Sequence, residues 1–230
     1  MRNYRWILWF SAMFVAVALV GFGAESAGEG KAPGRRGPGV EIPAKVMKAA
    51  STMVAKLVAK EVGLEGEKAD KFISAYVAER EAANTRLAEA VKANDPEARR
   101  KVFTDNREKM QAVMEANLSA DQAKKAQEML GFGGLEARVA VLMQAKVEDA
   151  KVEQALPILA KYNKASSDLF AKVRSNELSQ EDAQAKGKEL REAAIKDLTP
   201  IVGEENATKA LAQGMRGGRK GGGGGGGAEK

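Results

Sequence analysis

Apolar residues recur at intervals of three and four through most of the chain between residues 43 and 213, and this spacing is typical of amphipathic helices. The first such run ends at Gly63. Its apolar residues are Val46, Met47, Ala50, Met53, Val54, Leu57 and Val58. Alanine, lysine and glutamate are plentiful, whereas aromatic residues make up only 5% of the chain. Because these residues favour helices, the sequence predicts an all-α fold.

Two longer helices are predicted over residues 67–93 and 96–117. Between them, Asp95 can cap the next helix and Pro96 can occupy its first turn. A connection this short requires the two helices to lie antiparallel, as a helical hairpin. The apolar face expected on the first comprises Ala69, Phe72, Ile73, Tyr76, Val77, Ala83, Leu87 and Val91. The residues expected to be buried on the second are Val102, Phe103, Met110, Val113 and Met114.

A capping pattern follows this hairpin at Leu118-Ser119-Ala120-Asp121-Gln122. The Ser119 hydroxyl can accept from a backbone N–H of the next helix, and the Gln122 side chain can accept from the N–H of Ser119. We expect Leu118 to pack against the first turn of that helix, which ends at Gly131. The pattern is also common in unrelated helical proteins, where it only starts a helix.

The second half repeats this outline. Helices are predicted over residues 135–146, 149–175 and 179–197, and Pro157 is expected to kink the second of them. Leu198-Thr199-Pro200 then predicts another cap at Thr199, with Pro200 as the first helical residue. Offsets of about 80 residues align the two halves, which predicts two tandem helical-hairpin repeats over residues 43–131 and 132–213.

The two ends of the chain differ from this helical region. Residues 1–24 have a basic start, an uncharged apolar run and then small residues, which is typical of a secretory signal peptide. The run is long enough that an uncleaved N-terminal membrane anchor is the alternative. Residues 25–42 are rich in Gly and Pro and read as a flexible linker. Residues 214–230 form a Gly/Arg-rich tail that we expect to be disordered.

Charge and composition exclude several functions. The net charge is +6, but residues 44–213 hold 28 Lys and Arg against 27 Asp and Glu, so the excess lies at the two ends. The charge therefore does not call for a nucleic-acid groove. The chain has no Cys and no His, which removes the commonest nucleophile–base pairs and transition-metal ligands. We expect no enzymatic activity, no catalytic residue, no bound metal and no cofactor.

An exported helical hairpin that ends in Leu-Ser-x-x-Gln resembles the Spy/CpxP family of periplasmic proteins, whose hallmark is a Leu-Thr-x-x-Gln motif. The matching residues are Leu118, Ser119 and Gln122, with Ser where the family usually has Thr. A degenerate second copy begins at Leu198 and Thr199. The resemblance implies an ATP-independent chaperone or envelope-stress protein in the periplasm. Members hold unfolded proteins on curved helical cradles, usually as pairs of protomers. Either a homodimer or the two hairpins of this one chain would supply such a pair.

The resemblance leaves two functional hypotheses. In the first, exposed helical surface holds unfolded or partly folded proteins, and adaptable methionines contribute to it. These are Met47, Met53, Met110, Met114, Met129 and Met143. The simpler interpretation of each methionine is that it fills the core. Likewise, the charged residues of the helix predicted over residues 67–93 are most simply a solvent-exposed face: Lys68, Lys71, Glu79, Arg80 and Arg86. In the second, the chain is an anchored structural or adaptor protein of the envelope. In both, the basic tail could touch an anionic envelope surface.

Overall fold

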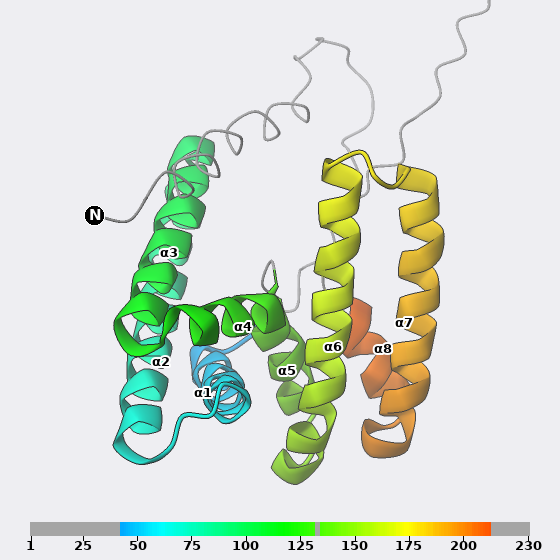
Figure 1. The fold of residues 1–230 in the computed structure, drawn as a ribbon, viewed down its shortest axis with the longest axis horizontal. Helices are drawn as coiled ribbons and strands as arrows, with labels where there is room; N and C mark the ends of the chain where they lie inside the picture. The colour runs from blue at the N-terminus through cyan, green and yellow to red at the C-terminus, as the bar shows by residue number, and fades with distance from the viewer. Residues whose placement is uncertain (1–41, 132–133, 213–230) are drawn as a thin grey trace, which may run out of the picture. The chain divides into compact units, whose positions relative to one another are not determined.

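The computed structural model describes residues 42–131 and 134–212, and in this part of the chain helices joined by short turns are the only regular secondary structure (Figure 1). It contains eight helices, which confirms the all-α prediction. They are α1 (Ala44–Glu61), α2 (Gly66–Lys92), α3 (Pro96–Asn117), α4 (Ala120–Leu130), α5 (Leu135–Gln144), α6 (Asp149–Arg174), α7 (Gln180–Val202) and α8 (Glu204–Ala212).

Local capping chemistry explains most of the helix boundaries. The Asp95 carboxylate accepts from the backbone N–H groups of Glu97 and Ala98 at 2.8 and 3.1 Å, so the predicted cap with Pro96 in the first turn is confirmed. The Ser179 hydroxyl accepts from the N–H of Asp182 at 3.0 Å and starts α7. The fifth helix ends earlier than predicted, because Lys146 has a left-handed φ of 59° that a helix cannot continue through.

The predicted cap at Thr199 is wrong. α7 runs without interruption from Gln180 to Val202, and Pro200 lies inside it. The Thr199 hydroxyl donates to the carbonyl of Ile195 at 2.7 Å, one turn back in the same helix. The helix continues because Leu198 and Val202 are both buried on one side of it, and packing then outweighs the bond that Pro200 cannot make. It ends one turn later at Gly203, whose φ is 82°.

Two antiparallel hairpins are formed, as predicted: α2 packs against α3, and α6 packs against α7 (Figure 1). Each half of the described chain also ends in a short helix, α4 or α8. The order of elements is thus the same in both halves, while a duplication of the sequence stays a prediction. α6 is continuous through Pro157, which is exposed.

One hydrophobic core includes residues from both halves of the chain. α5 packs against α1, α6 and α8, and α1 also packs against α2. Leu135, Val139 and Leu142 of α5 are completely buried in this core. The two halves therefore share this core, which we call the base and which contains α1, α5, α8 and the core residues of α2, α6 and α7. The division into repeats at residues 131 and 132 is not a division into separate cores.

Gly131 joins the first half to the second through a close approach to α6. Its φ is 54°, and a Cβ atom there would lie 2.3 Å from the Ser167 hydroxyl oxygen. Beside it, the Asn163 side-chain amide donates to the carbonyl of Leu130 at 2.6 Å. Glycine is required at this position both for the backbone conformation and for the space.

Three predicted regions lie wholly or almost wholly outside the described residues. They are the signal peptide or anchor at residues 1–24, the linker at 25–42 and the tail at 214–230. Of the helices at residues 42–131 and 134–212, none combines the length and apolar character needed to cross a membrane.

Candidate binding surface

The outer parts of the two hairpins lie outside the main core, although Ala83 and Ala90 of α2, on the helix that faces α3, are buried. We define the first arm as residues 91–113 of the α2–α3 hairpin and the second arm as residues 164–193 of the α6–α7 hairpin. Neither arm contains a buried residue. α3, which makes up most of the first arm, packs mainly against α2, so the side of α3 that faces away from α2 stays in contact with water.

Large apolar side chains lie on these arms and are exposed. In the first arm Val91 is 53% exposed and Phe103 62%, and in the second Phe170 is 69% exposed. The prediction that Phe103 is buried is wrong, and so is the inward orientation expected for Val91. Of the residues predicted to be buried on α3, only Met114 is, because the remaining length of α3 has no third helix to pack against.

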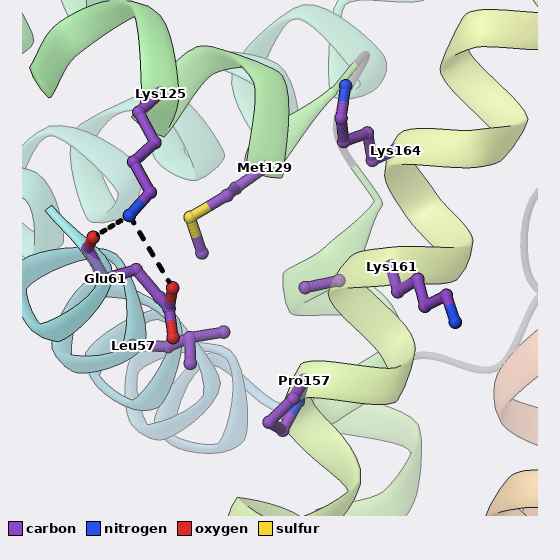
Figure 2. Close-up of a pocket in the computed structure, with 8 residues that line it drawn as sticks. Leu57, Glu61, Lys125, Met129, Pro157, Lys161 and Lys164 are labelled. Atoms are coloured by element: carbon purple, nitrogen blue, oxygen red, sulfur yellow. Dashed lines mark hydrogen bonds and ion pairs between the residues drawn. The ribbon is translucent and has the colours of Figure 1, made fainter. Parts of the chain in front are cut away.

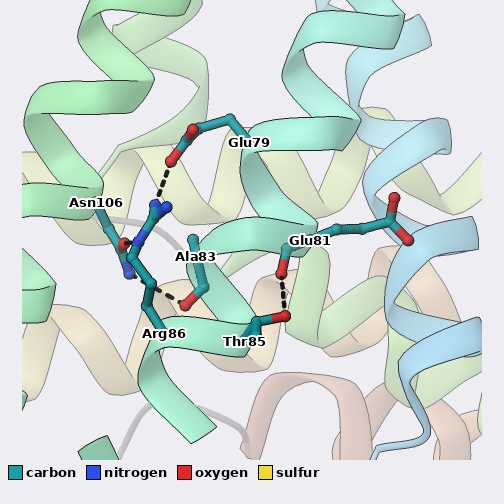
Figure 3. Close-up of polar contacts among 6 residues, drawn as sticks. All are labelled: Glu79, Glu81, Ala83, Thr85, Arg86 and Asn106. Carbon is teal, nitrogen blue, oxygen red and sulfur yellow. Dashed lines mark hydrogen bonds and ion pairs between the residues drawn. The ribbon is translucent and has the colours of Figure 1, made fainter. Parts of the chain in front are cut away.

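A polar cluster joins the two helices of the first hairpin (Figure 3). The Arg86 Nε donates to the Asn106 side-chain oxygen at 2.8 Å, and the same guanidinium pairs with Glu79. The Asn106 amide donates in turn to the carbonyl of Ala83 at 3.4 Å. The interpretation of Glu79 and Arg86 as merely solvated was wrong, since their side chains are only 17% and 25% exposed. This cluster supplies the cross-helix contacts that an apolar core would otherwise make.

The Leu118-Ser119-x-x-Gln122 motif forms the predicted capping box. The Ser119 N–H donates to the Gln122 side-chain oxygen at 3.0 Å, and the Gln122 N–H donates to the Ser119 hydroxyl at 3.3 Å. Leu118 is buried, while its expected contact with the first turn of α4 stays a prediction. The Gln122 amide also donates to the carbonyl of Val62 at 2.9 Å, at the end of α1. The motif therefore fixes α4 against α1, which is a structural role.

The second copy of the motif has a different role. Leu198 is completely buried, but Thr199 bonds within its own helix and caps nothing.

Lys125 adds to the contact between α4 and α1 at the first motif, since its ammonium group donates to the carbonyl of Glu61 and lies 3.8 Å from the Glu61 carboxylate. A cation at this position also stabilises the C-terminus of α1.

A groove of about 290 Å³ lies between α1, α4 and α6 (Figure 2). Its apolar lining is Leu57, Met129, Pro157 and Ala160. Its charged lining is Glu61, Lys125, Lys161 and Lys164. Lys164 is shared between the Glu128 and Asp168 carboxylates at 3.6 and 3.5 Å. The groove is open to water, because Glu61, Lys125, Pro157 and Lys161 are exposed.

A buried polar cluster joins α2 to α5 in the base. Glu136 is only 2% exposed, accepts from the Tyr76 hydroxyl and lies 2.6 Å from the Arg80 guanidinium. Burial raises the pKa of the Tyr76 hydroxyl well above its usual value, and the nearby Glu136 charge raises it further. Burial lowers the pKa of Arg80, but the Glu136 and Tyr76 charges outweigh it and leave that pKa raised.

Sequence reasoning missed this cluster. Arg80 was interpreted as part of a solvated face, and Glu136 was not singled out. The signal that could have found them is the pair of charges at Glu136 and Arg138, in a helix whose other residues up to Met143 are all apolar. Arg138 lies over the Tyr162 ring at 4.9 Å and donates to the carbonyl of Ala210 at 3.2 Å, and burial lowers its pKa.

Apart from the buried Glu136, the acidic side chains of the described residues are spread over the surface of the helices and of the turns between them. No three of their acidic side chains gather closely enough to hold a metal ion. The acidic pairs Glu148-Asp149 and Glu204-Glu205 are exposed and lie at the starts of α6 and α8. Lys209, 2.6 Å from Glu205, holds the pKa of that carboxyl below its usual value.

In comparisons with known proteins, no family model, no curated protein and no solved structure matches this chain. The resemblance to the Spy/CpxP family stays a prediction. The arms, the capping motif and the groove are the features from which a function is argued.

Proposed function

We propose that this protein is an exported, ATP-independent holding chaperone, which binds unfolded or partly folded proteins on the apolar surface of its two arms. One observation carries the proposal. Residues 91–113 and 164–193 form helices without burying a single residue, yet they carry Phe103 and Phe170 largely in water. Exposed apolar side chains of this size mark surfaces that meet a partner.

The composition of the arms suits clients of varied sequence. Charged residues surround the exposed apolar ones, so the arms stay soluble without a client. Of the six methionines singled out in the sequence, Met110 lies on an arm, where it is partly exposed. Flexible thioether side chains adapt to apolar surfaces of different shape. Binding of this kind requires neither a nucleotide nor a reactive side chain.

The test is suppression of aggregation, measured by light scattering of a reduced, unfolding client. Protein starting at residue 25 should suppress scattering at about equimolar ratio without ATP. The double variant F103S/F170S should lose at least half of the suppression. A matched control, K101S/K172S, changes exposed residues on the same arms and should act like the original protein. No suppression at several-fold excess would overturn the proposal.

Two further measurements separate this role from an anchored adaptor. N-terminal sequencing of the exported protein should find a start near residues 24–27, whereas an anchored adaptor would keep residue 1 or 2. Deletion of residues 214–230 should leave suppression unchanged, because the proposal places client binding on the arms.

A further inference from the structure

The groove between α1, α4 and α6 lies apart from the arm residues that carry the proposed function. Its apolar part comes from three helices: Leu57 from α1, Met129 from α4, and Pro157 and Ala160 from α6. Met129 projects into the space between α1 and α6 (Figure 2). The groove thus uses residues of both halves of the chain, and it exists only where the halves meet in the shared base.

The size and openness of the groove favour a side chain over a small molecule. Its volume of about 290 Å³ lies at the lower limit of pockets that enclose small molecules, about 300–1,000 Å³. Such pockets cover most of their ligand, whereas four of the eight residues here are exposed. One or two large apolar side chains of a polypeptide fit a shallow groove of this kind, as in helix-in-groove recognition.

The charges around the groove select among such polypeptides. Three lysines and the Glu61 carboxylate line it, but Lys125 is paired with Glu61, and Lys164 with the Glu128 and Asp168 carboxylates beside the groove. Lys161 has no carboxylate within ion-pair distance in the described part of the chain. Its ammonium group points away from Met129, at the outer edge of α6 (Figure 2). Lys125 lies 3.8 Å from the Glu61 carboxylate, and Lys164 pairs with exposed carboxylates, contacts that are weak enough to be exchanged.

We infer that this groove binds a polypeptide segment in which one or two large apolar residues are flanked by acidic residues. The apolar side chains contact Met129, Leu57 and Ala160, and the acidic flanks meet Lys161 and Lys125. This inference rests on the proposed function, since it names the class of client segment that is held at the base. It is separable from that function, because Lys164 is the one residue that the second arm and the groove share, and neither Phe103 nor Phe170 lines the groove.

Fluorescence anisotropy with three labelled 12-residue peptides tests the inference. The first has a central Leu-Phe pair flanked by Glu, the second the same pair flanked by Lys, and the third Ser in place of Leu-Phe with the Glu flanks kept. We expect the Glu-flanked apolar peptide to bind about tenfold more tightly than either of the others, and this preference to shrink at high salt. Equal binding of the Glu-flanked and Lys-flanked peptides would overturn the inference.

Two variants locate the binding in the groove. K161E should weaken binding of the Glu-flanked peptide about three- to tenfold, which corresponds to reversing one exposed charge contact. K196E is the matched control, an exposed lysine of α7 outside both the groove and the arms, and should have no effect. M129Q keeps the side-chain length and should weaken both apolar peptides. If K161E and K196E act alike, the groove is not the site.

The aggregation assay separates the two proposals. If the inference alone fails, the peptides show no charge preference while F103S/F170S still loses suppression. If the proposed function alone fails, the Glu-flanked peptide binds and K161E weakens it, but the protein suppresses no aggregation.

Discussion

α5 and α3 show the two ways in which this chain stabilises a helix. α5 has ten residues, and seven of them are buried: Leu135, Glu136, Arg138, Val139, Ala140, Val141 and Leu142. α3 has 22 residues, and only Met114 is buried. The shorter helix therefore contributes far more to the core than the longer one does.

The difference follows from the neighbours of each helix. α5 packs against α1, α6 and α8, so helices cover most of its circumference. α3 packs against α2 and only slightly against α4, and its remaining surface faces water. Apolar burial holds the base together, whereas the arms depend on hairpin pairing and on polar contacts such as that between Arg86 and Asn106. Large apolar side chains can stay exposed on the arms because the base supplies the stability.

The largest expected effect is the loss of a core side chain in the base. Leu142→Ala removes a completely buried side chain and should lower the free energy of unfolding by about 2–5 kcal/mol. Phe103→Ala removes a larger side chain, but one that is 62% exposed, and should change it by no more than about 0.5 kcal/mol. Urea unfolding followed by circular dichroism measures both. Similar losses for the two variants would contradict the contrast between base and arms.

The next effect compares a carboxylate of the base with one of an arm hairpin. Glu136→Ala leaves the buried Tyr76 hydroxyl and the Arg80 guanidinium without their shared partner. We expect a loss of about 3 kcal/mol, at the low end for a broken buried pair because the Arg80 side chain is 31% exposed. Glu79→Ala leaves Arg86 with Asn106 as a partner and should cost about 1 kcal/mol. Urea unfolding of both variants measures the two losses in the free energy of unfolding. A larger loss for Glu79→Ala than for Glu136→Ala would contradict the prediction.

The sequence predicted the helices well because their signals are local. Apolar spacing, Asp95 with Pro96, and Ser119 with Gln122 each act within one or two turns, so the helix type and most boundaries followed from them. Thr199 failed for a non-local reason. Its sequence matches a cap, but Leu198 and Val202 are held in the core, and tertiary packing kept the helix going.

The burial of a side chain could be predicted only where another helix could be assumed to pack against it. The spacing on α3 identified a face that includes Phe103, and the helix does have that face. The local sequence does not show that no other helix packs against this part of α3. The same limit applies to Glu136, whose partners Tyr76 and Arg80 lie about 60 residues earlier in the chain. The groove could not be predicted from the sequence for the same reason, because helices from both halves of the chain form it: α1, α4 and α6.

A smaller effect separates the two copies of the motif. Ser119→Ala removes a cap and should cost about 1 kcal/mol, whereas Thr199→Ala should cost less than about 0.5 kcal/mol because Thr199 caps nothing. Gln122→Glu keeps the oxygen that accepts from Ser119 but loses the donor to Val62, so it isolates the contact with α1. Thermal unfolding of the three variants checks the order, and a cost at Thr199 equal to that at Ser119 would show that both sites act as caps.

The last effect is a pH dependence that arises in the base. The pKa of Tyr76 is raised in the folded protein, so the folded state binds more protons than the unfolded state above pH about 10, the usual tyrosine pKa. The contribution of Tyr76 is therefore complete below that pH and is lost as the pH rises further, by at most about 1.4 kcal/mol per pH unit. Tyr76→Phe should make the decline between pH 9.5 and 11 shallower, even though it loses the hydrogen bond to Glu136 at every pH. Tyrosinate absorbance near 295 nm should show this hydroxyl ionising only as the protein unfolds, and its early titration in the folded protein would place Tyr76 in contact with water.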